Sequence, residues 1–293
     1  MRRWRWIAYL GVLLCTTLAL SGCSWPGARR GQGGPVEPAK VAQAEAIGER
    51  AQTAQDAGDL AAAEAELKRL TALTPGSPEA HQRLGVVLLL RGRPAEAETC
   101  FRKAVELDPD LVAALTGLGR VAAQSGRTAE ALKHLETAVE IEPHDAAAHL
   151  ELARVLEASG RIDDALAAYF RALESDPFLT AASRGIAAVQ LARGEADQSL
   201  VRLDQALEGD PGDVEAVFLR GRAHLALGQP VLAAADLQAA AERLPNRPDV
   251  HLALAHALAA ARRPVDALKA VETVLRLAPD DLDARSLGDT LRR

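Results

Sequence analysis

Residues 78–111, PEAHQRLGVVLLLRGRPAEAETCFRKAVELDPDL, contain two helical patterns separated by a glycine-containing turn. Ser77 can cap a helix that begins at Pro78, where the missing backbone N–H costs nothing. Gly92 suits the left-handed conformation that ends many helices, and Pro94 suits the first turn of the next helix. The stretch therefore predicts two antiparallel helices joined by a tight turn.

The apolar residues of this stretch are spaced as one face of each helix. In the second half, Ala97, Phe101, Ala104 and Val105 recur at three- and four-residue steps, which places them on one side. Small residues let the two helices approach closely, and a larger residue such as Phe101 fills the remaining gap. One helix pair cannot cover its own apolar faces, so pairs of this kind must stack on one another.

The same stretch recurs along the chain with a period of 34 residues. Seven prolines hold one position of this period: Pro75, Pro109, Pro143, Pro177, Pro211, Pro245 and Pro279. Six glycines hold a second position, in which Arg262 is the one departure: Gly58, Gly92, Gly126, Gly160, Gly194 and Gly228. A period of this length is typical of stacked helical repeats, so the predicted fold class is an all-α solenoid.

One set of residues repeats closely enough to indicate a family. It consists of Leu84-Gly85, Ala97, Phe101, Ala104 and Pro109, and it recurs as Leu118-Gly119, Ala131, Leu135, Ala138 and Pro143. This pattern resembles the tetratricopeptide repeat family. The resemblance implies a right-handed α-solenoid of about seven 34-residue helix-turn-helix repeats with a terminal capping helix. The repeats are assigned to residues 44–77, 78–111, 112–145, 146–179, 180–213, 214–247 and 248–281, and the capping helix to residues 282–293.

The chain also departs from the family pattern. The column that holds a first-helix Trp in the family contains Ile47, His81, Leu115, His149, Ser183, Val217 and His251. We interpret its three histidines as substitutions at a packing position. The first repeat is the most degenerate, with Arg50 and Ala51 where later repeats have Leu-Gly, and we expect it to act as an N-terminal cap.

The N-terminus has the order of a bacterial lipoprotein signal. Three arginines precede the uncharged run from Ile7 to Leu20, which is too short for a comfortable transmembrane helix. The run ends in Leu20-Ser21-Gly22-Cys23, which resembles the bacterial lipobox. The resemblance implies that residues 1–22 are a signal peptide and that lipid is attached to Cys23. The alternative is an ordinary secretory signal with an incidental cysteine.

Residues 23–43 are predicted to be the lipidated cysteine and a flexible tether, because residues 24–38 are rich in Gly and Pro. Ser24 follows the cysteine, whereas an Asp there retains many lipoproteins at the inner membrane. We therefore expect a periplasm-facing protein of the cell envelope, anchored by its lipid in the outer membrane.

Composition excludes several classes of function. The formal net charge is −6, and removal of residues 1–22, with three Arg and no acid, makes it −9, which argues against nucleic-acid binding. Cys100 is then the last cysteine besides Cys23, so no disulfide is predicted. The sequence contains no His-Glu-x-x-His motif, Gly-rich phosphate loop or Gly-x-Ser-x-Gly elbow. We predict no catalytic residue, metal, cofactor or small-molecule substrate.

A candidate binding surface follows from the resemblance, which implies that first helices line a concave groove. The residues predicted to face it are Val86, Leu89, Arg120, Leu150, Arg154, Arg184, Phe218, Arg222 and Leu225. Arginines among exposed apolar residues are typical of protein-binding surfaces. The alternative is that these arginines are solvated or paired with local acids such as Glu151 and Glu157. The family's carboxylate clamp uses Lys and Asn in these columns, and neither occurs there.

The resemblance implies a non-catalytic scaffold or assembly factor that binds protein partners in the groove. Similar proteins include pilotin-like lipoproteins that help pilus secretins assemble, and others support polysaccharide export or tight-adherence pili. An accessory regulator that activates a periplasmic cell-wall enzyme is the alternative. An enzyme with its site hidden in the solenoid is a third hypothesis, which no motif supports.

Overall fold

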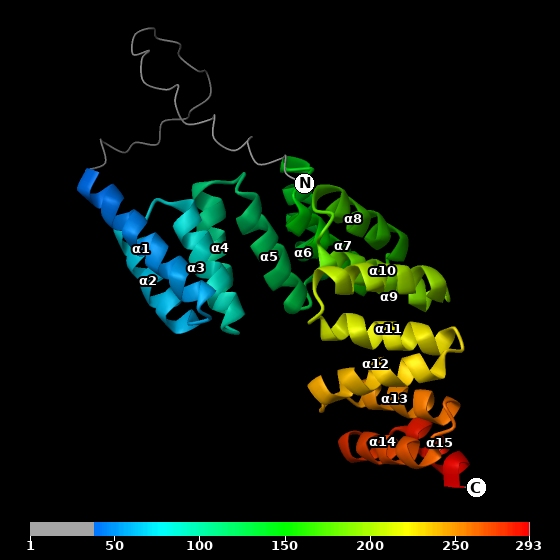
Figure 1. Cartoon of the computed structure of the whole chain (residues 1–293). Helices are drawn as coiled ribbons and strands as arrows, with labels where there is room; N and C mark the ends of the chain where they lie inside the picture. The colour runs from blue at the N-terminus through cyan, green and yellow to red at the C-terminus, as the bar shows by residue number, and fades with distance from the viewer. Residues whose placement is uncertain (1–37, 293) are drawn as a thin grey trace, which may run out of the picture. The chain divides into compact units, whose positions relative to one another are not determined.

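The computed structural model describes residues 38–292, which form fifteen α-helices and no strand (Figure 1). Their bounds are α1 Pro38–Asp56, α2 Leu60–Leu73, α3 Pro78–Leu90, α4 Pro94–Leu107, α5 Val112–Gln124, α6 Thr128–Ile141, α7 Ala146–Ala158, α8 Ile162–Ser175, α9 Thr180–Ala192, α10 Ala196–Gly209, α11 Val214–Ala226, α12 Pro230–Arg243, α13 Pro248–Ala260, α14 Pro264–Leu277 and α15 Leu282–Arg292. The chain divides into two units, residues 1–43 and 44–293, and the packing described here is that of the second. The predicted all-α solenoid is confirmed over the described range.

Helix starts follow the predicted repeat boundaries. Each predicted repeat from residue 78 onward begins on the first residue of an odd-numbered helix, from α3 to α13. The six glycines of the turn column have φ between 68° and 80°, as a left-handed turn requires. Arg262 takes the same place in the last repeat with φ 59°, a conformation that costs a non-glycine residue about 1–2 kcal/mol.

Three histidines connect a first helix to the turn that precedes it. The Nε2 atom of His81 lies 3.1 Å from the carbonyl oxygen of Pro75, and His149 and His251 make the same contact six residues back, at 3.0 Å. The ring N–H donates to a carbonyl that the helix itself cannot satisfy. This column therefore supplies a hydrogen bond as well as the packing that we expected of it.

Within a repeat, the two helices approach so closely that some positions admit no side chain. A Cβ atom at Gly85 would lie 2.7 Å from the Phe101 ring, and one at Gly119 would lie 2.5 Å from Leu135. Carbon atoms do not tolerate such distances in a close-packed interior without displacement of their neighbours. In these two repeats the glycine therefore leaves the room that Phe101 and Leu135 occupy.

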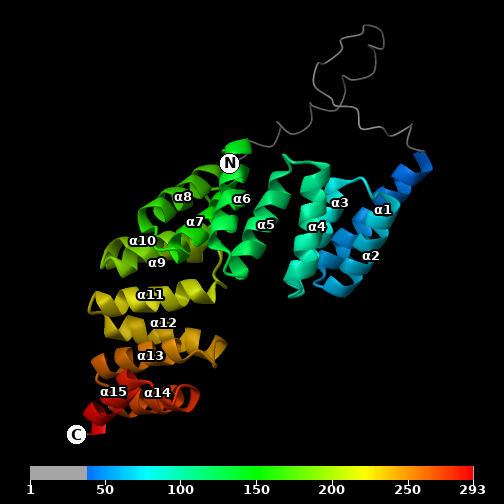
Figure 2. The ribbon, with the colours of Figure 1, turned by 180° about the vertical axis from the view of Figure 1, so that it is seen from behind.

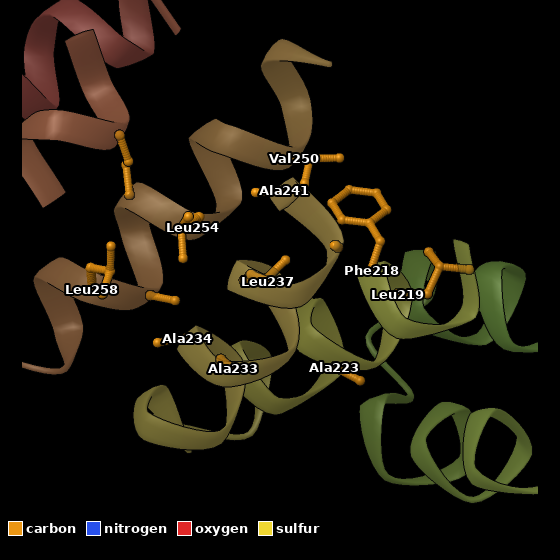
Figure 3. Packing of buried hydrophobic residues seen from close by; sticks show 14 of the residues in the cluster. Phe218, Leu219, Ala223, Ala233, Ala234, Leu237, Ala241, Val250, Leu254 and Leu258 are labelled. Carbon is orange, nitrogen blue, oxygen red and sulfur yellow. The ribbon is translucent and has the colours of Figure 1, made fainter. Parts of the chain in front are cut away.

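The core follows the chain from repeat to repeat instead of gathering at one centre. Between residues 47 and 284, buried apolar residues form successive clusters. In the last cluster, Phe218 of α11, Leu237 of α12 and Val250 of α13 belong to one packed group (Figure 3). Ala284 of α15 completes this cluster, and a Cβ at Gly288 would lie 3.2 Å from Val271. The terminal helix thus covers the apolar face that the last pair leaves.

One face of the stack is formed by the odd-numbered helices. From α3 to α13, each contacts the next odd-numbered helix as well as the even-numbered helix of its own repeat. The even-numbered helices contact the odd-numbered helix that follows them, and the pairs succeed one another in chain order in both views (Figures 1 and 2). The surface of the odd-numbered helices is termed the first-helix face below.

The N-terminal boundary of the helical region differs from the prediction. Helix α1 begins at Pro38, inside the segment 23–43 that was predicted to be a tether. Residues 38–43 contain no glycine, and a proline is well tolerated at the first position of a helix, so these residues can form one. The predicted signal peptide 1–22 and Cys23 lie outside the described residues. Between residues 38 and 292, no helix is long and apolar enough to span a membrane.

Candidate partner-binding site

All of the predicted groove residues lie on odd-numbered helices. These helices contact one another in sequence, so the residues follow the first-helix face. They are Val86 and Leu89 on α3, Arg120 on α5, Leu150 and Arg154 on α7, Arg184 on α9, and Phe218, Arg222 and Leu225 on α11. The 34-residue columns therefore place side chains of five repeats along one side of the stack.

The apolar members of this set are less exposed than the sequence suggested. Leu89, Leu150 and Phe218 are buried, because each packs into a hydrophobic cluster, and only Val86 and Leu225 are partly exposed. The expectation of an exposed apolar surface therefore does not hold at the three buried positions. Their direct contact with a partner would require displacement of the core.

Two of the four predicted arginines are paired with acids. The Arg154 guanidinium donates to Glu151 at 3.0 Å, and Arg184 forms an ion pair with Asp213, the N-cap of α11. Glu157 instead accepts the Tyr169 hydroxyl at 2.7 Å. Burial and this contact with a carboxylate raise the pKa of Tyr169. Local pairing, which the sequence left as an alternative, thus accounts for Arg154 and Arg184.

Arg222 is held by an aromatic ring instead of an acid. Its guanidinium carbon lies 5.7 Å from the Phe218 ring centroid, and that of Arg247 lies 5.3 Å from the same centroid. Asp249 and Glu215 raise the pKa of Arg247, Asp249 being the larger cause. Within the described residues, Arg222 has no carboxylate at ion-pair distance, so its charge is available on the first-helix face.

Arg120 lies in a hollow of about 210 Å³ on the first-helix face. This hollow, termed the Arg120 pocket, includes Gln82, Val86, Thr116, Arg120, Asp145 and Glu151 in its lining. The Arg120 Nε and the Thr116 Oγ1 are shielded from solvent and find no hydrogen-bond partner among the described residues. A buried polar group left in this state costs about 1–3 kcal/mol. A ligand acceptor at this place would remove that cost.

The acids of the Arg120 pocket are already engaged elsewhere. The Asp145 carboxylate accepts the Ala148 backbone N–H at 2.6 Å as the N-cap of α7, and Glu151 pairs with Arg154. Arg120 has no ion pair in residues 38–292, which leaves its charge for an external group. The arrangement suits a carboxylate or a backbone carbonyl of a bound segment.

Sequence reasoning placed Val86 and Arg120 at this site and did not select its other polar residues. Gln82 and Thr116 share one repeat column with Leu150 and Arg184, so the 34-residue spacing carried a signal for them. The N-cap Asp145 lies outside the helical columns, which is why column reading omits it. No group of three or more potential metal ligands occurs in the described part of the chain.

A stack of helix pairs with a polar hollow on one face defines a repeat scaffold for protein binding. Tetratricopeptide repeat family models match residues 77–144, residues 185–248, and both 122–188 and 224–288. These matches cover residues 77–288 without a gap, and the chain belongs to the tetratricopeptide repeat family. Members of this family are protein-interaction scaffolds and are generally not catalytic. No curated protein sequence matches the chain.

Solved structures share this fold at low sequence identity. The Cut9–Hcn1 hetero-tetramer of APC/C gives a TM-score of 0.72 at 17% identity and covers 80% of this chain, which spans only 48% of that one. PilF of Pseudomonas aeruginosa gives 0.60 at 16% identity, over 86% of this chain and 99% of that one. PilW, a type IV pilus biogenesis factor, gives 0.63 at 15% identity, over 72% and 97%. These likenesses establish the fold alone.

Proposed function

We propose that this protein is a non-catalytic scaffold whose first-helix face binds an extended segment of a partner protein. The observation that carries the proposal is the Arg120 pocket, where two polar atoms lack partners and one cation lacks an acid. A carboxylate or carbonyl of the partner would pair with the Arg120 guanidinium, which has no acid of its own among the described residues. Arg222, stacked on Phe218, adds a second cation further along the face.

We further propose that the scaffold serves the bacterial cell envelope as a lipoprotein anchored through Cys23, periplasm-facing and in the outer membrane. Support comes from the lipobox-like sequence Leu20-Ser21-Gly22-Cys23 and the absence of an acid at Ser24. The fold likeness to PilF and PilW supports a role in the assembly of a pilus or secretin complex. In this role the lipid holds the repeats near the membrane while the first-helix face holds the client.

The binding face is tested by in-cell crosslinking followed by affinity purification of the tagged protein. Arg120→Glu should reduce the crosslinked partner by about tenfold, the loss expected when an interfacial cation is reversed. Arg276→Glu is the matched control, because it makes the same charge change on the even-numbered helix α14, where Arg276 is exposed. Circular dichroism should show equal helicity for both variants.

Equal capture by the wild type and Arg120→Glu would refute the assignment of the binding face. The identity of the crosslinked protein tests the proposed role. A secretin or pilin partner supports the role in assembly, whereas a cell-wall enzyme would contradict that role and indicate a regulator of the enzyme. The anchor is tested separately by Cys23→Ala, which should leave the protein unlipidated and in the soluble fraction. A variant that still partitions with membranes like the wild type would contradict the anchor.

A further inference from the structure

The boundary between the fourth and fifth repeats breaks the repeat pattern with two exposed aromatic residues. Phe170 on α8 is 41% exposed, and Phe178 in the turn before α9 is 87% exposed. The other repeats hold polar residues in the Phe170 column, namely Lys68, Arg102, Glu136, Asp204, Gln238 and Glu272. They hold turn-forming or polar residues in the Phe178 column, namely Gly76, Asp110, His144, Gly212, Asn246 and Asp280. Neither phenylalanine is required by the repeat.

Two unusually small residues lie at the same boundary. Ser183 is the smallest member of the column that holds Ile47, His81, Leu115, His149, Val217 and His251 in the other repeats. Gly209, the last residue of α10, is the smallest of a column that otherwise holds Leu73, Leu107, Ile141, Ser175, Arg243 and Leu277. Their missing volume coincides with a cavity of about 510 Å³, which both residues line.

The walls of this cavity combine apolar surface with a cation. Leu173, Pro177 and Phe178 supply apolar atoms, and Arg202 of α10 lies beside them. The Arg202 guanidinium carbon sits 5.6 Å from the Phe170 ring centroid, which holds the side chain at the cavity. Its hydrogen bond is to the Gln205 side chain at 3.3 Å, and no acid of the described chain lies within ion-pair distance of it.

A serine side chain without a hydrogen-bond partner in the described chain also lines the cavity. Ser183 is only 7% exposed, and its side chain makes no hydrogen bond within residues 38–292. Glu208 is the one acid in the lining, and it lies six residues beyond Arg202, about 9 Å further along the α10 axis. The cavity therefore offers an apolar floor, a hydroxyl and an isolated cation at one end.

We infer that this cavity, with Phe178 in its wall and Phe170 stacked against its Arg202, is a second docking surface that binds a peptide segment of a partner protein carrying an apolar side chain next to an acid. The apolar side chain enters the cavity and packs on Leu173 and Phe178. The neighbouring carboxylate pairs with Arg202, which has no acid of its own. The Ser183 hydroxyl satisfies a polar group of the segment. This surface is distinct from the Arg120 pocket, since none of its lining residues belongs to that pocket.

Selection of random displayed peptides on the purified full-length chain tests the inference. The enriched peptides should carry an aromatic or branched aliphatic residue beside an Asp or Glu, and labelled copies give their Kd by fluorescence anisotropy. Phe178→Asp and Phe170→Glu restore residue types of the other repeats and should each raise Kd by about tenfold. Ser183→Val, the residue type of Val217, should do the same by filling the cavity.

Three controls separate this surface from other causes. Val265→Asp changes another exposed apolar residue and should leave Kd unchanged. Arg120→Glu should also leave it unchanged, so the result stands apart from the proposed function. Arg202→Gln should weaken the binding of peptides that carry Asp or Glu, but not the binding of the same peptides with Asn or Gln in that place. The inference would be overturned if no peptide were enriched, or if the enriched peptides carried no acidic residue. It would also be overturned if the peptides bound Phe178→Asp with the same Kd as the wild type. Self-association that Phe178→Asp abolishes would overturn it too, in favour of a second copy of this chain.

Discussion

Replacement of Glu64 by Gln tests the ion network that joins the first two repeats. Glu64 lies on α2 and is only 4% exposed. Its carboxylate accepts from Lys68 at 2.6 Å, from Arg93 at 2.8 Å and from Arg91. Arg91 and Arg93 flank the turn of the second repeat, so the network crosses the boundary between the repeats.

The size of the effect follows from the pKa of this carboxyl. The three cations, Lys68 first, lower the pKa of Glu64 from 4.5 to about 2, against the opposing effect of burial. At about 1.4 kcal/mol per pKa unit, this difference sets an upper bound of about 3 kcal/mol on the stabilisation. The side chains of the cations are a third or more exposed, so solvent screening reduces the expected loss to about 1.5 kcal/mol.

The pH dependence has a fixed sign. A carboxyl whose pKa is lowered by folding stabilises the fold at pH values above 4.5, and this contribution is lost as the pH falls toward 2. Urea unfolding followed by circular dichroism should therefore give a lower free energy of unfolding for Glu64→Gln than for the wild type at neutral pH. This difference should disappear as the pH is lowered. Glu174→Gln, in an exposed pair with Arg171, is the control and should cost less than about 0.5 kcal/mol. The reasoning would be refuted if the wild type and Glu64→Gln had the same free energy of unfolding at neutral pH. It would also be refuted if the difference at neutral pH persisted undiminished at pH 2.

Two further substitutions test the glycine columns. Arg262→Gly should stabilise the last repeat by about 1–2 kcal/mol, because φ 59° strains an arginine and not a glycine, and the thermal midpoint of unfolding should rise. An unchanged or lower midpoint would mean that the Arg262 side chain contributes more than its backbone costs. Gly119→Ala should destabilise the protein by about 1–3 kcal/mol in urea unfolding, since the new Cβ would lie 2.5 Å from Leu135. Gly76→Ala is its control, because a Cβ at Gly76 meets no atom within 4 Å, and equal stability of the two variants would contradict the close approach of α5 and α6.

The fold could be predicted from sequence because its signals are local and repeated. Gly92 and Pro94 mark one turn by their backbone preferences alone, and Gly228 and Pro230 repeat this pair. Four further turns keep only the glycine, and the turn at Arg262 keeps only the proline, yet all of them have the same positive φ at the first of these positions. The helix start at Pro38 escaped this reasoning, because the first repeat lacks the preceding turn from which the other starts were deduced.

The candidate site could be predicted only in part. A 34-residue column fixes the helix face of a residue but not how deeply the next repeat covers it, and so Leu150 and Phe218 are buried while Leu252, in the same column, is only partly buried. Arg120 and Arg154 share one column, yet only Arg154 has an acid on its own helix, three residues away. These differences arise from the individual side chains of each repeat, whereas a repeat pattern describes only what the repeats have in common.

The cavity beside Phe178 shows the opposite case, in which the departures from periodicity carry the information. Phe170 and Phe178 stand out in columns that are otherwise polar or turn-forming, so the sequence alone could have indicated an exposed aromatic pair. That Ser183 and Gly209, far apart in sequence, open one cavity becomes visible only when α9 and α10 are packed together.

The division of the core into successive clusters has a mechanical consequence. One cluster ends with Ile186 and the next begins with Ala187, so the seam between them falls within the single helix α9. In a linear stack, a force applied at the two ends passes through every junction in series, and the junction with the least shared packing extends first. A second seam falls between Val121 and Ala122, within α5. A pull on this protein should therefore concentrate its elongation at the third and fifth repeats, and a client held across either seam would sense the load.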